Sequence, residues 1–137
     1  MPPSLSASAT LYRVRAAEAM PLSSGGEIEP GDQLYLDLSA PEATHAYVLD
    51  EGGPGRVTVL FPCAGAGVAN PLPAGPPHRL PGGDARGGVN WLVTSAEGRE
   101  TFLIVISRRP LAALEHALAS MPQPEVADGL GYASLSD

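Results

Sequence analysis

The sequence predicts an all-β domain: an antiparallel β-sandwich with immunoglobulin-like layering, about seven short strands, one long Pro/Gly-rich loop and one C-terminal helix. Sixteen glycines and fifteen prolines in 137 residues are too many for long helices, but they suit short elements joined by turns. Apolar and polar residues alternate in short runs, most clearly over residues 33–39. The stretch 63–88 lies between apolar strands and has little periodicity of its own.

Length and composition fit a single folded domain. The chain has room for one hydrophobic core, and its 44% hydrophobic and 17% charged residues suit a globule better than a disordered segment. Residues 1–8 are rich in Pro, Ser and Ala, so we expect a flexible N-terminus. We expect the sandwich domain over residues 9–121, with its helix over 110–121, and a flexible acidic tail over 122–137.

The N-terminal part contains two predicted strands. Residues 11–15 alternate and begin the first strand, and residues 22–30 form a turn region around a Gly-Gly pair. Residues 33–39 form the second strand, in which Leu34, Leu36 and Leu38 share one face while polar side chains and a tyrosine share the other.

A hairpin is predicted next. Residues 45–49 form a short strand, and the turn-forming residues 50–55 connect it to an antiparallel strand over 56–61. Pro62 ends that strand because proline has no N–H to donate to a ladder.

A long loop and a second hairpin follow. Loops as long as 63–88 inside compact domains are usually functional or disordered. Residues 89–95 and 101–107 are two predicted strands joined by a turn over 96–100. The run Leu103 to Ile106 is apolar on both faces, so we expect a central strand that is covered on each side.

One helix is predicted after these strands. Pro110 suits a first helical turn, and Pro122 follows the last apolar position. Leu111, Leu114, Leu118 and Met121 share one face. We expect this helix to cover a face or an edge of a sheet.

Charge and composition exclude several partners. The net charge is −7 and the eight basic residues, all arginine, are scattered, whereas a nucleic-acid binder needs a concentrated cationic face. No run approaches the ~20 apolar residues that span a bilayer, so we expect neither nucleic-acid binding nor direct membrane insertion. The sequence does not indicate a cellular compartment. The chain could belong to the extracytoplasmic part of a membrane-anchored bacterial protein.

Neither a metal nor a cofactor is expected. A lone cysteine, Cys63, permits no internal disulfide and no cysteine-based zinc knuckle, and the three histidines do not cluster. Asp50-Glu51 lacks the alternating oxygen ligands of a calcium loop, so we interpret both as solvated charges in a turn.

An ordered set of short landmarks spans the centre of the chain. They are Gly31-Asp32, Leu34, Ala46-Tyr47-Val48, Val59-Leu60-Phe61-Pro62, Asn70-Pro71-Leu72, Ala74-Gly75, Leu80-Pro81, Gly98, Glu100 and Ser107. In order and spacing this set resembles the bacterial domain-of-unknown-function family four-three-eight-four, over about residues 28–110. The resemblance implies an accessory module of the kind attached to Ser/Thr protein kinases, caspase-like peptidases and membrane-anchored anti-sigma-type regulators. It therefore implies a partner or sensor role in signalling, and it carries over no catalytic residue.

The proline-containing landmarks also have a physical interpretation. Phe61-Pro62 buries a ring at a strand end and then turns the chain out of the sheet, and Leu80-Pro81 repeats this arrangement. The amide of Asn70, which precedes a proline, can fasten backbone that has no ladder to join. These residues are expected to hold the long loop in one shape.

A candidate binding site combines aromatic and loop residues. Aromatic side chains supply contact area, and loops supply hydrogen-bonding groups. We place the site where Tyr47, Trp91 and the loop from Asn70 to His78 converge, and we expect it to bind a protein partner or a small ligand.

Two alternatives remain open. Cys63 with His45 or His78 is the one possible nucleophile–base pair, as in a cysteine-dependent hydrolase. Cys63 does not begin a helix, which favours an ordinary packing role. The other alternative is a structural spacer, which predicts neither an apolar patch nor an ordered loop.

Overall fold

The computed structural model describes residues 4–53, 55–63, 67–84, 87–94 and 100–128. In chain order the elements are β1 (Ser8–Arg15), β2 (Glu18–Pro21), β3 (Gln33–Ser39), β4 (His45–Gly53), β5 (Arg56–Phe61), β6 (His78–Leu80), β7 (Gly82–Asp84), β8 (Gly87–Leu92), β9 (Thr101–Ser107), α1 (Ala112–Leu118) and β10 (Val126–Asp128).

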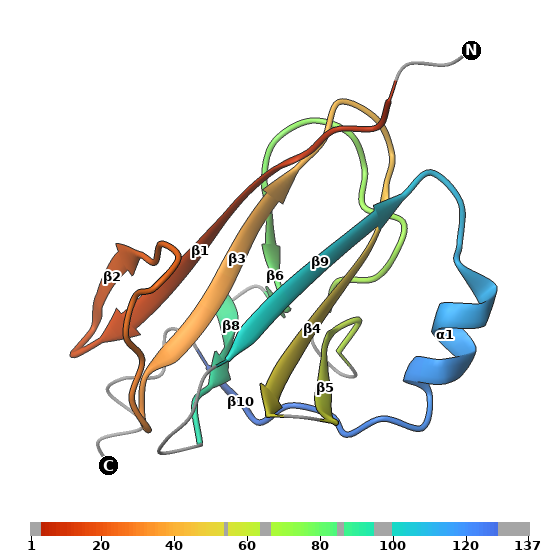
Figure 1. The fold of residues 1–137 in the computed structure, drawn as a ribbon. Coiled ribbons are helices and arrows are strands. Elements are labelled where there is room, and N and C mark those ends of the chain that lie inside the picture. Colours follow the sequence, from red (N-terminus) through yellow and green to blue (C-terminus); the bar gives the residue numbers. More distant parts are fainter. Residues whose placement is uncertain (1–3, 54, 64–66, 85–86, 95–99, 129–137) are drawn as a thin grey trace.

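Two antiparallel sheets form the body of the domain (Figure 1). The larger sheet runs β10-β8-β3-β1-β2, with β6 paired to β3 and β7 paired to β8. The smaller sheet runs β5-β4-β9. The predicted all-β sandwich with one C-terminal helix is confirmed, with ten strands in the described part of the chain rather than about seven.

The main core fills the space between the sheets. The three leucines of β3 all point into it, so the alternation predicted for residues 33–39 is confirmed. They meet Val48 from β4 and Phe61 from β5, which are 2% and 0% exposed. Each such side chain contributes about 1.5–3 kcal/mol by leaving water.

A second, smaller core lies on the outer face of the three-stranded sheet. Tyr47 of β4 and Val59 of β5 pack there against Leu118 of α1. The helix therefore covers a sheet face, as expected (Figure 1). It is shorter than the predicted 110–121, because it begins at Ala112 and ends at Leu118.

The predicted second hairpin is wrong. β8 belongs to the larger sheet and pairs with β3, β7 and β10, whereas β9 belongs to the smaller sheet and pairs with β4. The chain thus crosses from one layer to the other between them, and most of the predicted turn over 96–100 lies outside the described residues. β9 is also an edge strand instead of a central one.

Four short strands were not predicted. β2 follows β1 through Ala16 and Ala17, which both have positive φ, 53° and 66°. Two-residue hairpin turns with positive φ usually contain Asn or Gly, and an Ala-Ala pair is not a recognisable turn signal. β6 and β7 lie within the stretch expected to be a long loop, and β10 lies within the expected tail over 122–137.

The proline landmarks act largely as expected. Phe61 and Leu80 are fully buried, and both precede prolines at the ends of their strands. The Asn70 amide bonds to the backbone of Ala46, with its Oδ1 accepting from the N–H at 2.9 Å and its Nδ2 donating to the carbonyl at 2.8 Å. Asn70 therefore fastens the loop to β4.

Candidate functional site

A cavity of about 260 Å³ lies between the sheets, at the end where β4 connects to β5. Its apolar walls come from both sheets and include Leu34, Leu60, Trp91 and Phe102. The C-terminal segment 123–125 lines a further side. The volume lies just below the range of drug-sized sites, so the cavity suits a small molecule.

Two carboxyl groups meet in this cavity, from Asp50 near the end of β4 and from Glu100 just before β9. Burial, together with the charge and hydrogen bond of Glu100, raises the pKa of Asp50 to about 7. Because carboxylates accept but cannot donate, a hydrogen bond between them requires a proton. The pair therefore shares one proton at mildly acidic pH.

One oxygen atom of each carboxyl group is buried without a hydrogen-bond donor in the described structure. Asp50 Oδ1 and Glu100 Oε2 are buried, and within the described ranges neither accepts a hydrogen bond from an N–H or hydroxyl. A Cβ on Gly52 would lie 2.6 Å from Glu100 Oε2, so the glycine leaves the space that this carboxyl group occupies.

The expectation that Asp50 is a solvated charge in a turn is wrong. β4 continues to Gly53, and Asp50 follows the inward-facing Val48 by two residues. It therefore points to the same face of the strand. Extending the two-residue alternation of β4 beyond Leu49 would have placed Asp50 on the inward face. Glu100 belongs to the set of landmarks and stands just before an apolar strand.

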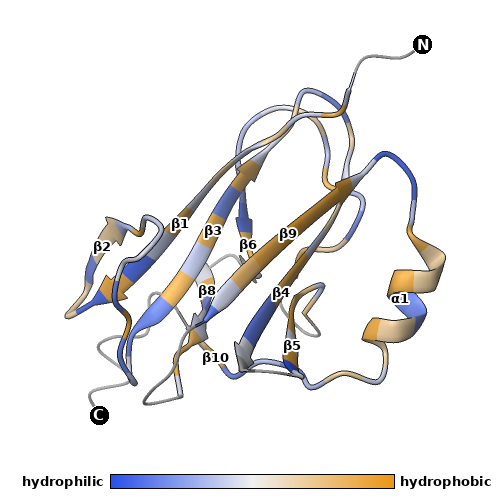
Figure 2. Cartoon of the chain, viewed as in Figure 1, coloured by the Kyte–Doolittle hydropathy of each residue, from blue (hydrophilic) through white to orange (hydrophobic). Residues whose placement is uncertain are grey.

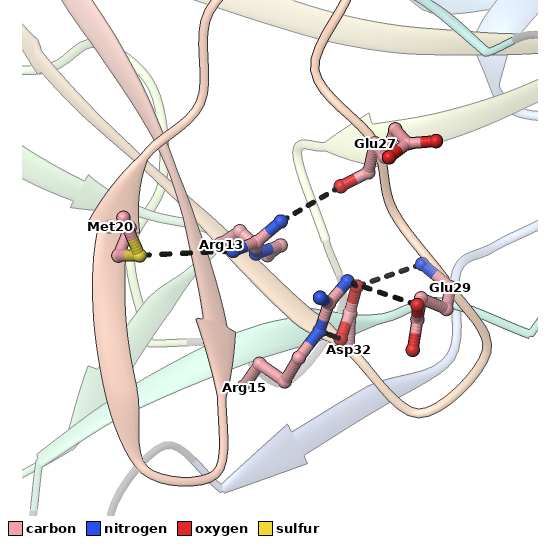
Figure 3. Close-up of polar contacts among 6 residues, drawn as sticks. All are labelled: Arg13, Arg15, Met20, Glu27, Glu29 and Asp32. Carbon is pink, nitrogen blue, oxygen red and sulfur yellow. Dashed lines mark hydrogen bonds and ion pairs between the residues drawn. The ribbon is translucent and has the colours of Figure 1, made fainter.

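An ion pair holds the turn beside the cavity (Figure 3). Arg15 donates two hydrogen bonds of 2.7 Å to the buried carboxylate of Asp32, which also accepts one of 2.8 Å from the N–H of Glu29. The bond from Arg15 lowers the pKa of Asp32. Gly31, with a φ of 95°, donates to the carbonyl of Val93, whose own N–H donates to the carbonyl of Asp32. Val93 lines the cavity, so the Gly31-Asp32 landmark fixes part of its wall.

Of the predicted binding residues, Trp91 lines the cavity. It is 3% exposed, and its Nε1 donates a hydrogen bond of 2.8 Å to the carbonyl of Leu60, so one side chain connects the two sheets. His78 is elsewhere, with its Nε2 2.8 Å from the carbonyl of Pro73.

Tyr47 lies under the helix, on the opposite face of β4 from the cavity. Its hydroxyl donates to Glu115 Oε2 at 2.5 Å and accepts from the N–H of Leu111 at 3.0 Å. Burial, followed by the bond to Glu115, raises the pKa of Tyr47. The four predicted residues therefore do not converge, because Tyr47 and Trp91 belong to different cores and Asn70 is occupied by the backbone of β4.

Cys63 is 8% exposed, and burial raises the pKa of its thiol. A raised pKa keeps the sulfur protonated at neutral pH, which opposes nucleophilic attack.

A second surface of interest is the free edge of β9. This strand pairs with β4 alone among the described strands, and it contains no charged residue and no proline. Leu103 is 53% exposed and Ile104 is 36% exposed. Figure 2 shows much of β9 in the colours of hydrophobic residues.

The other described edges are protected. β2 has four residues and ends in a proline, and β10 has three residues. β5 has a bulged register with β4, and the N–H of Val59 donates to the carbonyl of Pro122. Short length, proline, bulges and covering segments are the usual means of blocking edge-to-edge pairing. Within the described residues, β9 has seven residues, no proline and no strand paired to its outer edge.

No helix in the described part of the chain is long and apolar enough to cross a membrane. Over the same residues, no three His, Cys, Asp or Glu side chains gather as a set of metal ligands.

Comparison with known proteins identifies one family. No curated protein and no solved structure matches the chain. The model of the domain of unknown function DUF4384 matches residues 27–110, which include the Gly31-Asp32 turn, the strands from β3 to β9 and the carboxyl pair. Since this match spans more than half of the sequence, the chain belongs to the DUF4384 family.

Proposed function

We propose that this chain is a non-catalytic accessory domain of a bacterial signalling or regulatory system, and that it recognises an extended segment of a protein partner along β9. The observation that supports this proposal is the long, uncharged edge of β9, with which no described strand other than β4 pairs. The signalling context rests on the kinds of protein to which such domains are attached.

The chemistry of the edge defines the occupant. An added strand gains main-chain hydrogen bonds from the unpaired N–H and carbonyl groups of an edge, and its alternate side chains give specificity. Leu103 and Ile104 occupy opposite faces of β9, so apolar side chains are available on both sides of the edge. The partner segment is therefore an extended strand with apolar residues on both faces.

The state of Cys63 supports a non-catalytic role over a cysteine hydrolase. Catalysis would need a thiolate, whereas burial raises the pKa of this thiol. We expect Cys63 in the folded protein to react with iodoacetamide at least about tenfold more slowly than in 6 M urea. Equal rates in the two conditions, measured by intact mass, would restore the hydrolase alternative.

Selection of linear peptides from a displayed random library tests the recognition proposal. Selected peptides should be apolar and extended, and their binding should slow hydrogen exchange at the amides of β9. Leu103→Lys places a charge at the edge and should weaken peptide binding by about tenfold or more.

Val126→Lys is the matched control, because Val126 is a 43% exposed apolar residue on an edge strand of the other sheet. Peptides that protect other strands, or that bind Leu103→Lys undiminished, would disprove the proposal. Self-association through β9, detected by light scattering and abolished by Leu103→Lys, would replace the partner strand with a second copy of this chain.

A further inference from the structure

We propose that the cavity between the sheets binds a small organic ammonium ion, with its charged group between Asp50 and Glu100 and its apolar part against Trp91 and Phe102. This inference is independent of the β9 edge, since none of these side chains is required for strand addition.

The charge of the cavity favours a cation. Four charged side chains line it: three are acidic, Asp50, Glu100 and Glu125, and one is basic, Arg56. Arg56 is exposed, and it forms no ion pair with any of the three acids. The two paired carboxyl groups are therefore not neutralised by the protein once their shared proton is lost.

The geometry of the pair favours an ammonium group. Asp50 Oδ1 and Glu100 Oε2 are buried acceptors with no N–H or hydroxyl directed at them in the described structure. An ammonium group has three N–H donors and can bridge two carboxylates. Below about pH 7 the exchange balances charge, because one proton leaves the pair to solvent as one cation enters; above about pH 7 the cation takes the place of the proton that the pair has already lost.

The remaining walls favour an organic cation over a metal ion. Calcium requires six to eight oxygen ligands and magnesium requires near-octahedral oxygen coordination, whereas the cavity offers two paired carboxyl groups beside aromatic and aliphatic walls. An alkyl chain can pack on those walls, and a cation close to Trp91 or Phe102 gains from the ring face. The volume of about 260 Å³ limits the guest to a small molecule.

Trp91 provides the measurement, because it is the only tryptophan in the chain and lines the cavity. Titration with n-butylammonium chloride at pH 8, at constant ionic strength, should change its fluorescence with saturation. Butan-1-ol, which has the same chain without the charge, should bind at least about tenfold more weakly.

The pH dependence gives a second measurement on the unaltered protein. Protons compete with the cation for the Asp50–Glu100 pair, so binding at pH 5.5 should be about tenfold or more weaker than at pH 8. The other charged side chains that line the cavity are those of Arg56 and Glu125, and no described histidine lines it.

Asp50→Asn and Glu100→Gln should each abolish saturable binding at pH 8. Glu51→Gln is the matched control, because it removes the same charge from the exposed residue next to Asp50 and should leave binding unchanged. Near-UV circular dichroism checks that each variant is folded. If a variant fails to fold, two measurements on the unaltered protein still test the proposal: binding at pH 5.5 against pH 8, and binding of butan-1-ol against n-butylammonium.

Three outcomes would overturn the proposal. They are equal affinity for butan-1-ol and n-butylammonium, undiminished binding by both cavity variants, and a saturable response to calcium chloride at lower concentration than to n-butylammonium chloride. None of these outcomes would affect the recognition of a strand at β9.

Discussion

Asp50 changes its proton affinity when the chain folds. Its ordinary pKa is 3.8 and its pKa in the fold is about 7. Between these values the folded state keeps the proton that the unfolded state has lost. The free energy of unfolding therefore falls as the pH rises from about 4 to about 7, and this contribution is constant above that interval.

Asp50→Asn should remove this dependence, because an amide resembles the protonated carboxyl group. We expect the variant to be about 1–3 kcal/mol more stable than the parent at pH 8 and equal to it near pH 4; this range allows for partial solvent screening. Urea unfolding at several pH values measures the difference. Asp32, whose pKa is lowered by Arg15, gives both proteins the opposite slope at lower pH and cancels in the comparison.

Glu51→Gln should keep the parent's slope, since Glu51 is exposed. A slope that survives in Asp50→Asn would show that Asp50 is not the group that holds the proton. Asp50→Asn also separates stability from binding, because the variant should be more stable than the parent at pH 8 but should no longer bind the ammonium ion.

Single residues were predicted best where one chemical property decides their position. The amide of Asn70 was expected to fasten backbone, and it does so on Ala46. Asp50 was missed because its neighbours in the sequence are turn-forming residues, which hid the continuation of the strand. Both Trp91 and Tyr47 were predicted to line one binding site. Trp91 does lie in the main core beside the cavity, but Tyr47 lies in the second core, because its face of β4 meets the helix.

At the scale of elements, the β1–β2 hairpin contains an unfavourable turn. Ala16 and Ala17 connect the strands with positive φ at both positions. Residues with a Cβ lose about 1–2 kcal/mol in this conformation, and Asn-Gly is the sequence that such turns prefer. The double substitution Ala16→Asn with Ala17→Gly should therefore stabilise the protein by about 1–2 kcal/mol, measured by urea unfolding.

Ala19→Gly serves as the control for glycine itself. Ala19 lies inside β2, where glycine gains nothing from its conformational freedom and should destabilise the strand. No gain from the turn substitution would indicate that the hairpin frays before the domain unfolds.

Strands were predicted correctly where one face is buried and the other is exposed, because apolar and polar residues then alternate along the strand. β3 has one face in the core and one outside, so its alternation is a direct record of its position. β9 has apolar residues on both faces for a different reason: Phe102 packs in the main core and Val105 in the second core, while Leu103 stays 53% exposed at the edge. Four successive apolar residues do not distinguish an edge strand from a central one. The difference depends on whether a second strand pairs with β9, and the residues of β9 carry no information about that.

At the scale of the whole molecule, the C-terminal segment joins the two sheets. The N–H of Val59 in the smaller sheet donates to the carbonyl of Pro122, and the N–H of Leu92 in the larger sheet donates to the carbonyl of Glu125. β10 then pairs with β8, with Val126 opposite Trp91. This segment lies beyond the residues that match the family, and it lines the cavity as well.

Ending the chain at Met121 should therefore loosen the sandwich at the cavity. A chain that ends at Asp128 is the reference, because it keeps each of these contacts. We expect the shorter chain to be about 2–3 kcal/mol less stable, since it loses the β10 ladder and the two hydrogen bonds to the sheets. Its Trp91 emission should shift to longer wavelength as water reaches the ring. If both chains unfolded at the same urea concentration with the same emission, the two sheets would be held together by their shared core alone, and the C-terminal segment would be only a lining of the cavity.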